Sequence, residues 1–477
     1  MLPALSASRP LRLTFVTAMY VAQGVQYGLL IIAIPAYLAA QGASPVAIGG
    51  FISAAVLPWT LKLLYAPLME RYTVLAMGRR RPWVLVGTLG AAAGYVAMTL
   101  VPDPLANLGL LTGVMVGGSL FLALQDIATD ALTIDVVPLD EQPFANGLMW
   151  GGKVFGIAGT SAGGAWLLGA VGLLGTLLAA AVVTLAFMAL PLVVRERPGE
   201  RLLPWTAGAA SPEARALQLD GWRAIGRSLR RVVFLPASLL VAAAGFALLL
   251  HQGLFDAYGP VFVVQHLGWT DAAFSNAKAL GTLVGGLVGM IGGGWLVRWL
   301  GRARAVRAAL LVLVAVAVAM ALAAPLWSTA LVTAAYLLLW VTAQTLATIA
   351  FFATCMALCW RPVAGVQFSL YMAIGNVGLV TGSALMGPLV GALTPSQMFA
   401  AMAVVPVATA VLLLRVDVAA HVDRLAALDA SPLPPTSPLP MGQGEGGSTA
   451  AIPRPPLTPA LFPRGVETGS ARTRHGH

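Results

Sequence analysis

Long apolar runs alternate with short polar segments along most of the chain. A helix that crosses the hydrocarbon core of a bilayer needs about 20 mostly apolar residues. Segments such as 41–45 and 102–104, rich in Gly, Pro, Asp and Ser, separate the runs and are typical of turns. We therefore predict an all-α membrane protein with twelve spanning helices, at residues 13–39, 46–69, 83–101, 106–137, 143–168, 171–194, 233–264, 270–297, 305–324, 329–358, 363–391 and 396–415.

The spacing of the runs divides the chain into parts. Six predicted spans precede one long polar connection and six follow it, a pattern typical of membrane proteins built from two repeated halves. Beyond about residue 431 the chain is dense in Pro, Gly and Ser, which predicts disorder. We predict an N-terminal six-helix bundle, a central loop, a C-terminal six-helix bundle and a tail, at residues 1–194, 195–232, 233–416 and 417–477.

The basic residues predict the orientation. Every arginine falls on one alternating set of connections or near the chain ends, and the opposite connections contain neither Lys nor Arg. Lys and Arg are enriched in the cytoplasmic loops of membrane proteins. Both termini, the central loop and the tail are therefore predicted to be cytoplasmic, in a multi-pass protein of the inner (plasma) membrane.

Composition excludes a soluble protein. Apolar residues make up 58% of the chain and charged residues only 10%, with a mean hydropathy of +0.85, whereas about 25% of residues are charged in soluble domains. The net charge of +10 does not indicate nucleic acid binding, because it follows the loops of one side. Cys355 and Cys359 have no His or acid beside them, which indicates helix packing. We expect a monomer in the lipid bilayer, without metal or cofactor.

Charged side chains inside a span are costly and are usually paired or functional. Lys62 and Lys153, of the second and fifth spans, lie at about the depth of two acids of the fourth span. Two interpretations stay open, a static network that neutralises its own charges and a site for protons or solute. One face of the fourth span, about 140° wide, carries five polar residues, Gln125, Asp126, Thr129, Asp130 and Thr133.

The more specific hypothesis concerns the deeper of the two acids. Asp126 is expected to be the proton-coupling residue, with Lys62 or Lys153 as its partner. Asp130, nearer the cytoplasm, is then a relay or a member of a gate. These four residues are the predicted charge cluster of the first half.

Uncharged polar residues also fall near the middle of the membrane. Tyr20, Gln23 and Tyr27 share one face of the first span, and Gln344 and Asn376 lie in the tenth and eleventh spans. All five are candidates for solute binding. Such side chains can instead hydrogen-bond a neighbouring helix.

In the second half, Asp256 and Lys278 lie toward the outer ends of the seventh and eighth spans, and His251 lies below them. We expect these three residues to form an outer-side gate. The alternative function from another class is a membrane-embedded acyltransferase, which would need a catalytic His with an acid or an Asn. Only His251 and Asp256 suit it, and they are five residues apart rather than four.

Residues 147–153 have the glycine and lysine spacing of a phosphate loop, but Val154 replaces the required Ser or Thr and no strand precedes them. No other segment indicates an ATPase, so that any transport should be driven by an ion gradient. A receptor that does not transport is a third class, which the absence of counterflow in liposomes would reveal.

Two segments resemble a known family. Residues 57–72, LPWTLKLLYAPLMERY, and 78–83, GRRRPW, resemble the loop motif of the major facilitator superfamily. Residues 125–131, QDIATDA, are similar to a motif of its branch that holds AmpG-type muropeptide permeases and acetyl-CoA transporters. The resemblance implies the proton-coupled uptake of a moderately large polar solute, such as a muropeptide. A siderophore or an acyl-CoA is the alternative solute, and export of a drug or metabolite is the alternative direction.

The resemblance also implies a cytoplasmic gate, with departures from the family pattern. Glu70 stands where aspartate is commoner, and Arg298 occupies the acidic position of the corresponding loop in the second half. The fifth span lacks the proline of the exporter-type motif, which favours import. The expected gate residues are Glu70, Arg71, Arg79, Arg80 and Asp135.

Overall fold

The computed structural model describes residues 4–430 except 44, 220, 270 and 294–298. The predicted disorder from about residue 431 and the position of Arg298 therefore lie outside the described residues. The first helix group consists of α1 (Arg9–Tyr27), the π-helical turn η2 (Gly28–Ala33), α2 (Ile34–Ala40), α3 (Pro45–Thr60), α4 (Lys62–Arg71), α5 (Arg81–Thr99), α6 (Leu108–Val136) and α7 (Gln142–Val193).

Two short helices, α8 (Pro212–Leu217) and α9 (Trp222–Val233), follow in the central loop, and α17 (Val418–Ala430) comes last. Neither the loop helices nor α17 were predicted, because they are too short to span a membrane. The second helix group consists of α10 (Pro236–Pro260), η4 (Val261–His266), α11 (Asp271–Val288), η5 (Gly289–Gly293), α13 (Arg302–Leu322), α14 (Ala330–Ala357), η7 (Arg361–Val363), α15 (Ala364–Ala392) and α16 (Pro395–Leu414).

Within the described residues, ten helical stretches are long and apolar enough to cross a membrane. One of them, α7, has 52 residues and a positive φ of 69° at Gly172, where two helices meet. A further apolar helix, Ala277–Gly292, is shorter than the others. The fold is thus all-helical and multi-pass, while the count of twelve crossings and the cytoplasmic termini stay predictions.

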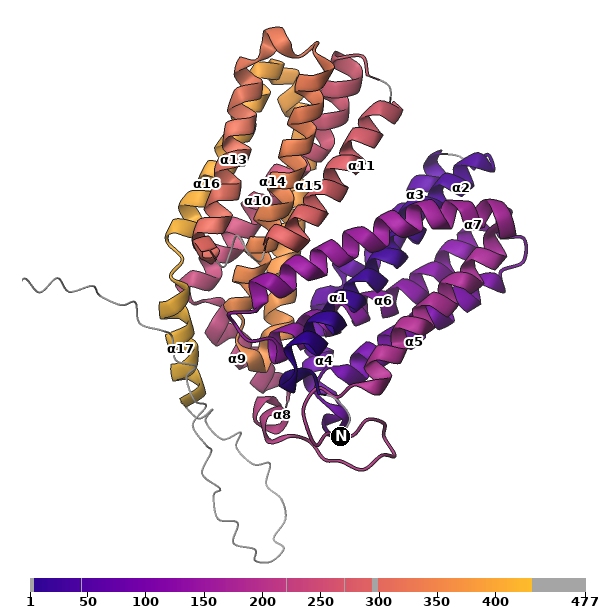
Figure 1. The fold of residues 1–477 in the computed structure, drawn as a ribbon, viewed down its shortest axis with the longest axis vertical. Helices are drawn as coiled ribbons and strands as arrows, with labels where there is room; N and C mark the ends of the chain where they lie inside the picture. The colour runs from indigo at the N-terminus through magenta and orange to yellow at the C-terminus, as the bar shows by residue number, and fades with distance from the viewer. Residues whose placement is uncertain (1–3, 44, 220, 270, 294–298, 431–477) are drawn as a thin grey trace, which may run out of the picture. The chain divides into compact units, whose positions relative to one another are not determined.

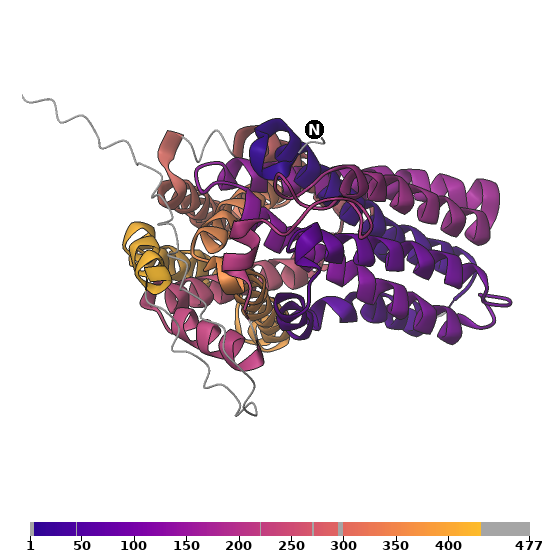
Figure 2. The same ribbon diagram turned by 90° about the horizontal axis from the view of Figure 1, so that it is seen from below.

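The helices pair in the same way in both groups. In the first, α1 packs along α7, α3 along α6, and α5 along α6 and α7. In the second, α10 packs along α15, α11 along α14, and α13 along α14 and α16. Each pairing of the first group thus has a counterpart in the second, typical of carriers with internal repeats. Figure 1 shows the first group in indigo to magenta, and Figure 2 shows its helices side by side from below.

The two groups contact each other where α7 meets α11, η5 and α14, and where α15 meets α4 and α6. Large apolar side chains are exposed on the outer faces of both groups, Trp166, Leu311 and Leu331 among them at 64–77%. An exposed apolar surface of this extent fits lipid rather than water.

Candidate transport site

A break in the second span positions the first charged residue. Leu61 has non-helical backbone angles between α3 and α4, so that Lys62 is the first residue of α4. Its ammonium is buried and forms an ion pair with the Asp126 carboxylate of α6. The same ammonium lies 3.9 Å from the Met372 sulfur of α15. Lys62 therefore stands at the boundary between the two helix groups.

Asp130 lies one turn from Asp126 on the same face of α6, and it is buried too. Its carboxylate accepts a hydrogen bond from the Tyr20 hydroxyl of α1. Among the described residues, no lysine or arginine lies within ion-pairing distance of Asp130. The two acids of α6 therefore have different partners, an ammonium for Asp126 and a neutral hydroxyl for Asp130.

Lys153 of α7 is held by a close crossing with α1. A Cβ added at Gly24 would lie 2.1 Å from the Lys153 carbonyl oxygen, so only glycine allows this approach. The Lys153 ammonium lies 6.0 Å from the ring centre of Tyr27 and 5.5 Å from that of Trp150, within the range of cation–π contact. Within the described part of the chain, no carboxylate pairs with it directly. We call Lys62, Asp126, Asp130 and Lys153 the central charge cluster.

The structure separates the five predicted solute-binding residues. The Tyr20 hydroxyl already donates a hydrogen bond to Asp130. The amide of Gln23 is buried and has no hydrogen-bond partner in the described structure. Tyr27 is 38% exposed. The Gln344 oxygen lies 3.3 Å from Nδ1 of His251. Asn376 is exposed and lies one turn along α15 from the methionine that contacts Lys62.

Two of the three expected outer-side residues come together. The Lys278 ammonium of α11 donates to the Asp256 carboxylate of α10 over 2.9 Å, and both side chains are about one-third exposed. His251 is fully buried instead, bound to Gln344 and 5.5 Å from the Trp340 ring centre. Five residues along a helix rotate a side chain by about 140°, which turns His251 away from the pair. The expected trio is therefore a pair.

Four of the five expected gate residues form one buried cluster. The Glu70 carboxylate pairs with Arg79 over 2.5 Å and with Arg80 over 2.8 Å. Asp135 pairs with the same two guanidinium groups over 3.2 and 3.0 Å. Arg71 lies outside this cluster, with its guanidinium 5.2 Å from the Tyr72 ring centre. We call Glu70, Arg79, Arg80 and Asp135 the loop cluster.

The loop cluster bonds directly to the second helix group. The Arg79 guanidinium donates to the carbonyl oxygens of Arg361, over 2.8 Å, and Pro362, over 2.6 Å. The Glu70 carboxylate accepts the backbone N–H of Gly365, in the first turn of α15, over 3.0 Å. A carboxylate is stabilised at a helix N-terminus by the free N–H groups and the helix dipole. These bonds join the groups on the side of the arginine-rich loops.

Glu196 is a buried residue of this region that the sequence pattern did not predict. Its carboxylate accepts the backbone N–H groups of Arg79, over 2.8 Å, of Arg80, over 2.5 Å, and of Arg81. It therefore caps α5 and fixes the backbone of the loop cluster. The available signal was the alternation of charges at 195–197, directly after a span.

Glu200, four residues further, is also buried, and it accepts bonds from the Ser211 hydroxyl and the Arg197 N–H. Burial and the charge of Glu196 raise the pKa of Glu200 to about 7, against the hydrogen bonds and the charge of Arg197. This part of the central loop therefore contains a carboxyl group that titrates near neutral pH.

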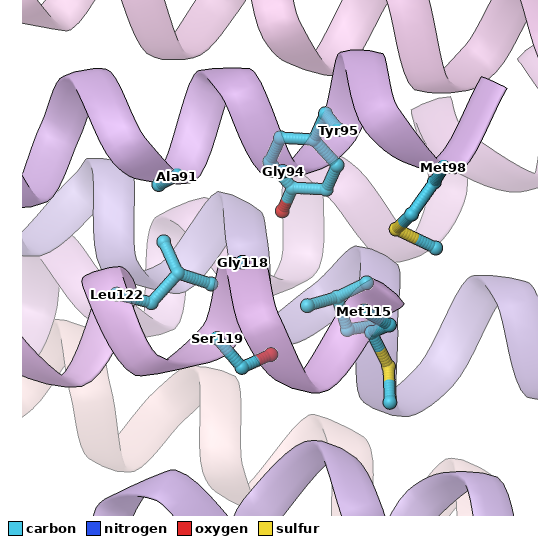
Figure 3. A pocket seen from close by; sticks show the side chains of 9 residues that line it. Ala91, Gly94, Tyr95, Met98, Met115, Gly118, Ser119 and Leu122 are labelled. Atoms are coloured by element: carbon cyan, nitrogen blue, oxygen red, sulfur yellow. The ribbon is translucent and has the colours of Figure 1, made fainter. Parts of the chain in front are cut away.

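A small void inside the first group is not a solute site. It has a volume of about 10 Å³ and lies between α5 and α6 (Figure 3). The hydroxyl groups of Tyr95 and Ser119 line it without a hydrogen-bond partner in the described structure. This volume suits at most one water molecule.

The chain matches the sequence model of the Major Facilitator Superfamily over residues 16–382. It is 33% identical over 97 residues to an uncharacterized protein of Haemophilus influenzae, which covers 20% of this chain and 23% of that one. It is 34% identical over 93 residues to the anhydromuropeptide permease of Escherichia coli K12, which covers 20% and 19%. The matched stretches span about a fifth of the length of these curated relatives.

Solved transporters share the fold. The human organic anion transporter MFSD10 (TETRAN) aligns with a TM-score of 0.59 at 18% identity, over 85% of this chain and 100% of that one. FucP, a fucose:proton symporter of E. coli, aligns in its outward conformation with a TM-score of 0.63 at 15% identity, over 86% and 99%. With the paired helix groups and the family match over most of the chain, these findings show that the chain belongs to the major facilitator superfamily of membrane transporters.

Proposed function

We propose that this transporter couples the uptake of a moderately large polar solute, such as a muropeptide, to the entry of protons across the inner membrane. The central charge cluster is the observation that carries the proposal. Its members come from α4, α6 and α7 and lie among apolar helices. Ionisable groups at such a position are costly and usually mark an ion or substrate pathway.

Proton coupling follows from the pairing within the cluster. With both lysines protonated and both aspartates ionised, the four charges cancel. A proton bound at Asp126 would neutralise the partner of Lys62 and release its ammonium, which stands between α6 and α15. A proton bound at Asp130 would leave that pair intact. Asp126 is therefore the proposed coupling residue, and Asp130 the relay.

The loop cluster is the proposed cytoplasmic gate. Its buried bonds to Arg361, Pro362 and Gly365 join the two groups on the arginine-rich side. Contacts that exist in one state only shift the equilibrium toward that state. In the proposed transport cycle, closure of this side would precede opening of the central charge cluster to the outside, as the first step of uptake requires. The Asp256–Lys278 pair is the proposed outer-side gate.

The solute class rests on unsatisfied polar groups and on the similarity to a permease. The Gln23 amide lacks a partner in the described structure, and the Lys153 ammonium faces aromatic rings rather than a carboxylate. Together they could bind amide and carboxylate groups, both of which a peptide on a sugar carries. The E. coli relative is named as an anhydromuropeptide permease.

Uptake into proteoliposomes tests the proposal. Purified protein would be given an inward proton gradient and, in turn, an anhydromuropeptide, a siderophore and an acyl-CoA. We expect the anhydromuropeptide to accumulate above its outside concentration, and a protonophore to abolish the accumulation. Accumulation that persists in the presence of the protonophore would refute proton coupling. Accumulation of another solute alone would refute the muropeptide class.

A further inference from the structure

Helix α9 of the central loop has two distinct faces. Ala224, Ile225, Ser228 and Val232 are buried, and α9 packs against α4, α10, α15 and η7. The Trp222 ring lies 6.0 Å from that of Tyr72 and fixes the start of the helix. At 100° per residue, the four arginines fall within about 100° of one another, beside the buried face. They are Arg223, Arg227, Arg230 and Arg231.

This basic face is concave. Arg227, Arg230, Arg231 and Phe234 line a recess of about 650 Å³. In the described structure none of these three guanidinium groups pairs with a carboxylate, and Arg227 donates only to the Arg223 carbonyl oxygen, over 3.4 Å. Three unneutralised cations that converge on one recess repel each other, and an anion bound among them would remove that repulsion.

The recess lies beside the start of a candidate membrane span. Phe234 precedes the first residue of α10 by two positions, and α10 opens the candidate span Pro236–His266. The Phe234 side chain is 67% exposed. Apolar side chains such as Phe on amphipathic helices insert at the boundary between headgroups and acyl chains, and arginines next to a span attract anionic lipids. The recess thus combines three guanidinium groups, unpaired with carboxylates in the described structure, with an exposed apolar ring beside a candidate span.

We propose that Arg227, Arg230, Arg231 and Phe234 bind the headgroup of an anionic phospholipid from the leaflet that faces the arginine-rich loops. The guanidinium groups hold the phosphate through charge-assisted hydrogen bonds. The Phe234 ring lies against the glycerol and the upper acyl chain. This site is independent of the transported solute and of the central charge cluster.

Native mass spectrometry of the full-length protein, with phosphatidylglycerol and phosphatidylcholine supplied in equal amounts, tests the site. The unaltered protein should retain phosphatidylglycerol preferentially. The triple variant Arg227→Gln/Arg230→Gln/Arg231→Gln should lower that preference by about tenfold or more. The matched control Arg215→Gln/Arg415→Gln/Arg424→Gln removes the same charge from exposed arginines outside the recess and should keep it.

If the triple variant is unstable, single variants at the same three positions replace it, and each should lose part of the preference for phosphatidylglycerol. Equal retention of the two lipids by the unaltered protein would overturn the proposal, as would an equal loss in the control. Inorganic phosphate is the competitor that separates the sources of the anion. If millimolar phosphate displaces phosphatidylglycerol, the recess is a site for free anions and the lipid assignment is wrong.

Discussion

Lys62 and Asp126 are buried charges that neutralise each other between α4 and α6. Removing one member of a buried pair leaves the other uncompensated, at a cost of about 3–5 kcal/mol, whereas apolar residues in both places are often tolerated. We expect Lys62→Met to destabilise the protein by about that amount. The double variant Lys62→Met/Asp126→Leu should recover most of the loss.

Unfolding of the purified protein in detergent, followed by thermal midpoint, measures both variants. Equal midpoints for the single and the double variant would mean that the two side chains do not compensate each other. The double variant must lose proton-driven uptake even when it is stable, so that stability and coupling are separated at one position.

At the residue scale, the sequence predicts the burial of Lys62 and Asp126 but not every buried charge or its partner. Lys62 and Asp126 are predictable because each interrupts an apolar run, and a buried ammonium needs an anion. In the structure His251 contacts Gln344 rather than Asp256, because helix rotation separates His251 from Asp256. Glu196 was missed because its bonds reach residues 115–117 positions away, and no periodicity encodes such a contact.

At the scale of elements, the crossing of α1 and α7 positions Lys153. A Cβ added at Gly156 would lie 2.3 Å from the Val21 carbonyl oxygen, whereas one added at Gly159 would meet nothing within 4 Å. Gly156→Ala should therefore separate the helices and destabilise the protein by about 1–3 kcal/mol. It should also slow uptake, because Lys153 lies one turn away.

Gly159→Ala is the matched control, since it makes the same change on the same helix and should leave both stability and uptake near their original values. Thermal midpoints and uptake rates of the two variants would be compared side by side. If both variants behave alike, close packing at this crossing does not position the site.

The central loop is expected to dock in a pH-dependent way. The pKa of Glu200 is about 7 in the docked loop because of burial and the charge of Glu196, above its ordinary value near 4.5. Docking therefore favours the protonated form, and its stability is lost as pH rises from about 4.5 through about 7. The charged side chains of Glu196 and Arg197 act on Glu200 in the docked loop.

Hydrogen exchange of residues 196–211 at pH 6 and pH 8 measures this effect. After correction for the intrinsic exchange rate, protection should fall by up to about tenfold between pH 6 and pH 8. Glu200→Gln keeps the shape, removes the titrating group and should remove the pH dependence. If the unaltered protein and Glu200→Gln show the same pH dependence of protection after correction, the role of Glu200 is contradicted.

The elements were partly predictable for physical reasons. Apolar length locates the spans, since a bilayer demands about 20 residues from each crossing. The break at Leu61 inside the second span was not predicted, because an apolar run does not record backbone angles. The non-helical Gly172, where two helices of α7 meet, lies close to the boundary predicted between residues 143–168 and 171–194. Helix α9 was absent from the prediction because its amphipathic pattern is shorter than a span.

At the scale of the whole molecule, gating and proton coupling are assigned to two separate structural features. The loop cluster joins the helix groups on the arginine-rich side, and the Lys62–Asp126 pair lies deeper, at the contact with α15. Because Asp126 and Asp135 both belong to α6, a movement of this helix would reach both features. We infer that proton binding and gate opening are coupled through α6.

Proton-driven accumulation by Asp126→Asn is the most direct test of this account. Proteoliposomes that contain the variant would receive an anhydromuropeptide from outside under an inward proton gradient. Exchange of the solute without a gradient would be measured in parallel. We predict that Asp126→Asn loses accumulation and retains exchange, while the exposed control Asp140→Asn accumulates solute like the unaltered protein. If Asp126→Asn still accumulates solute against its gradient, the coupling role of Asp126 is contradicted.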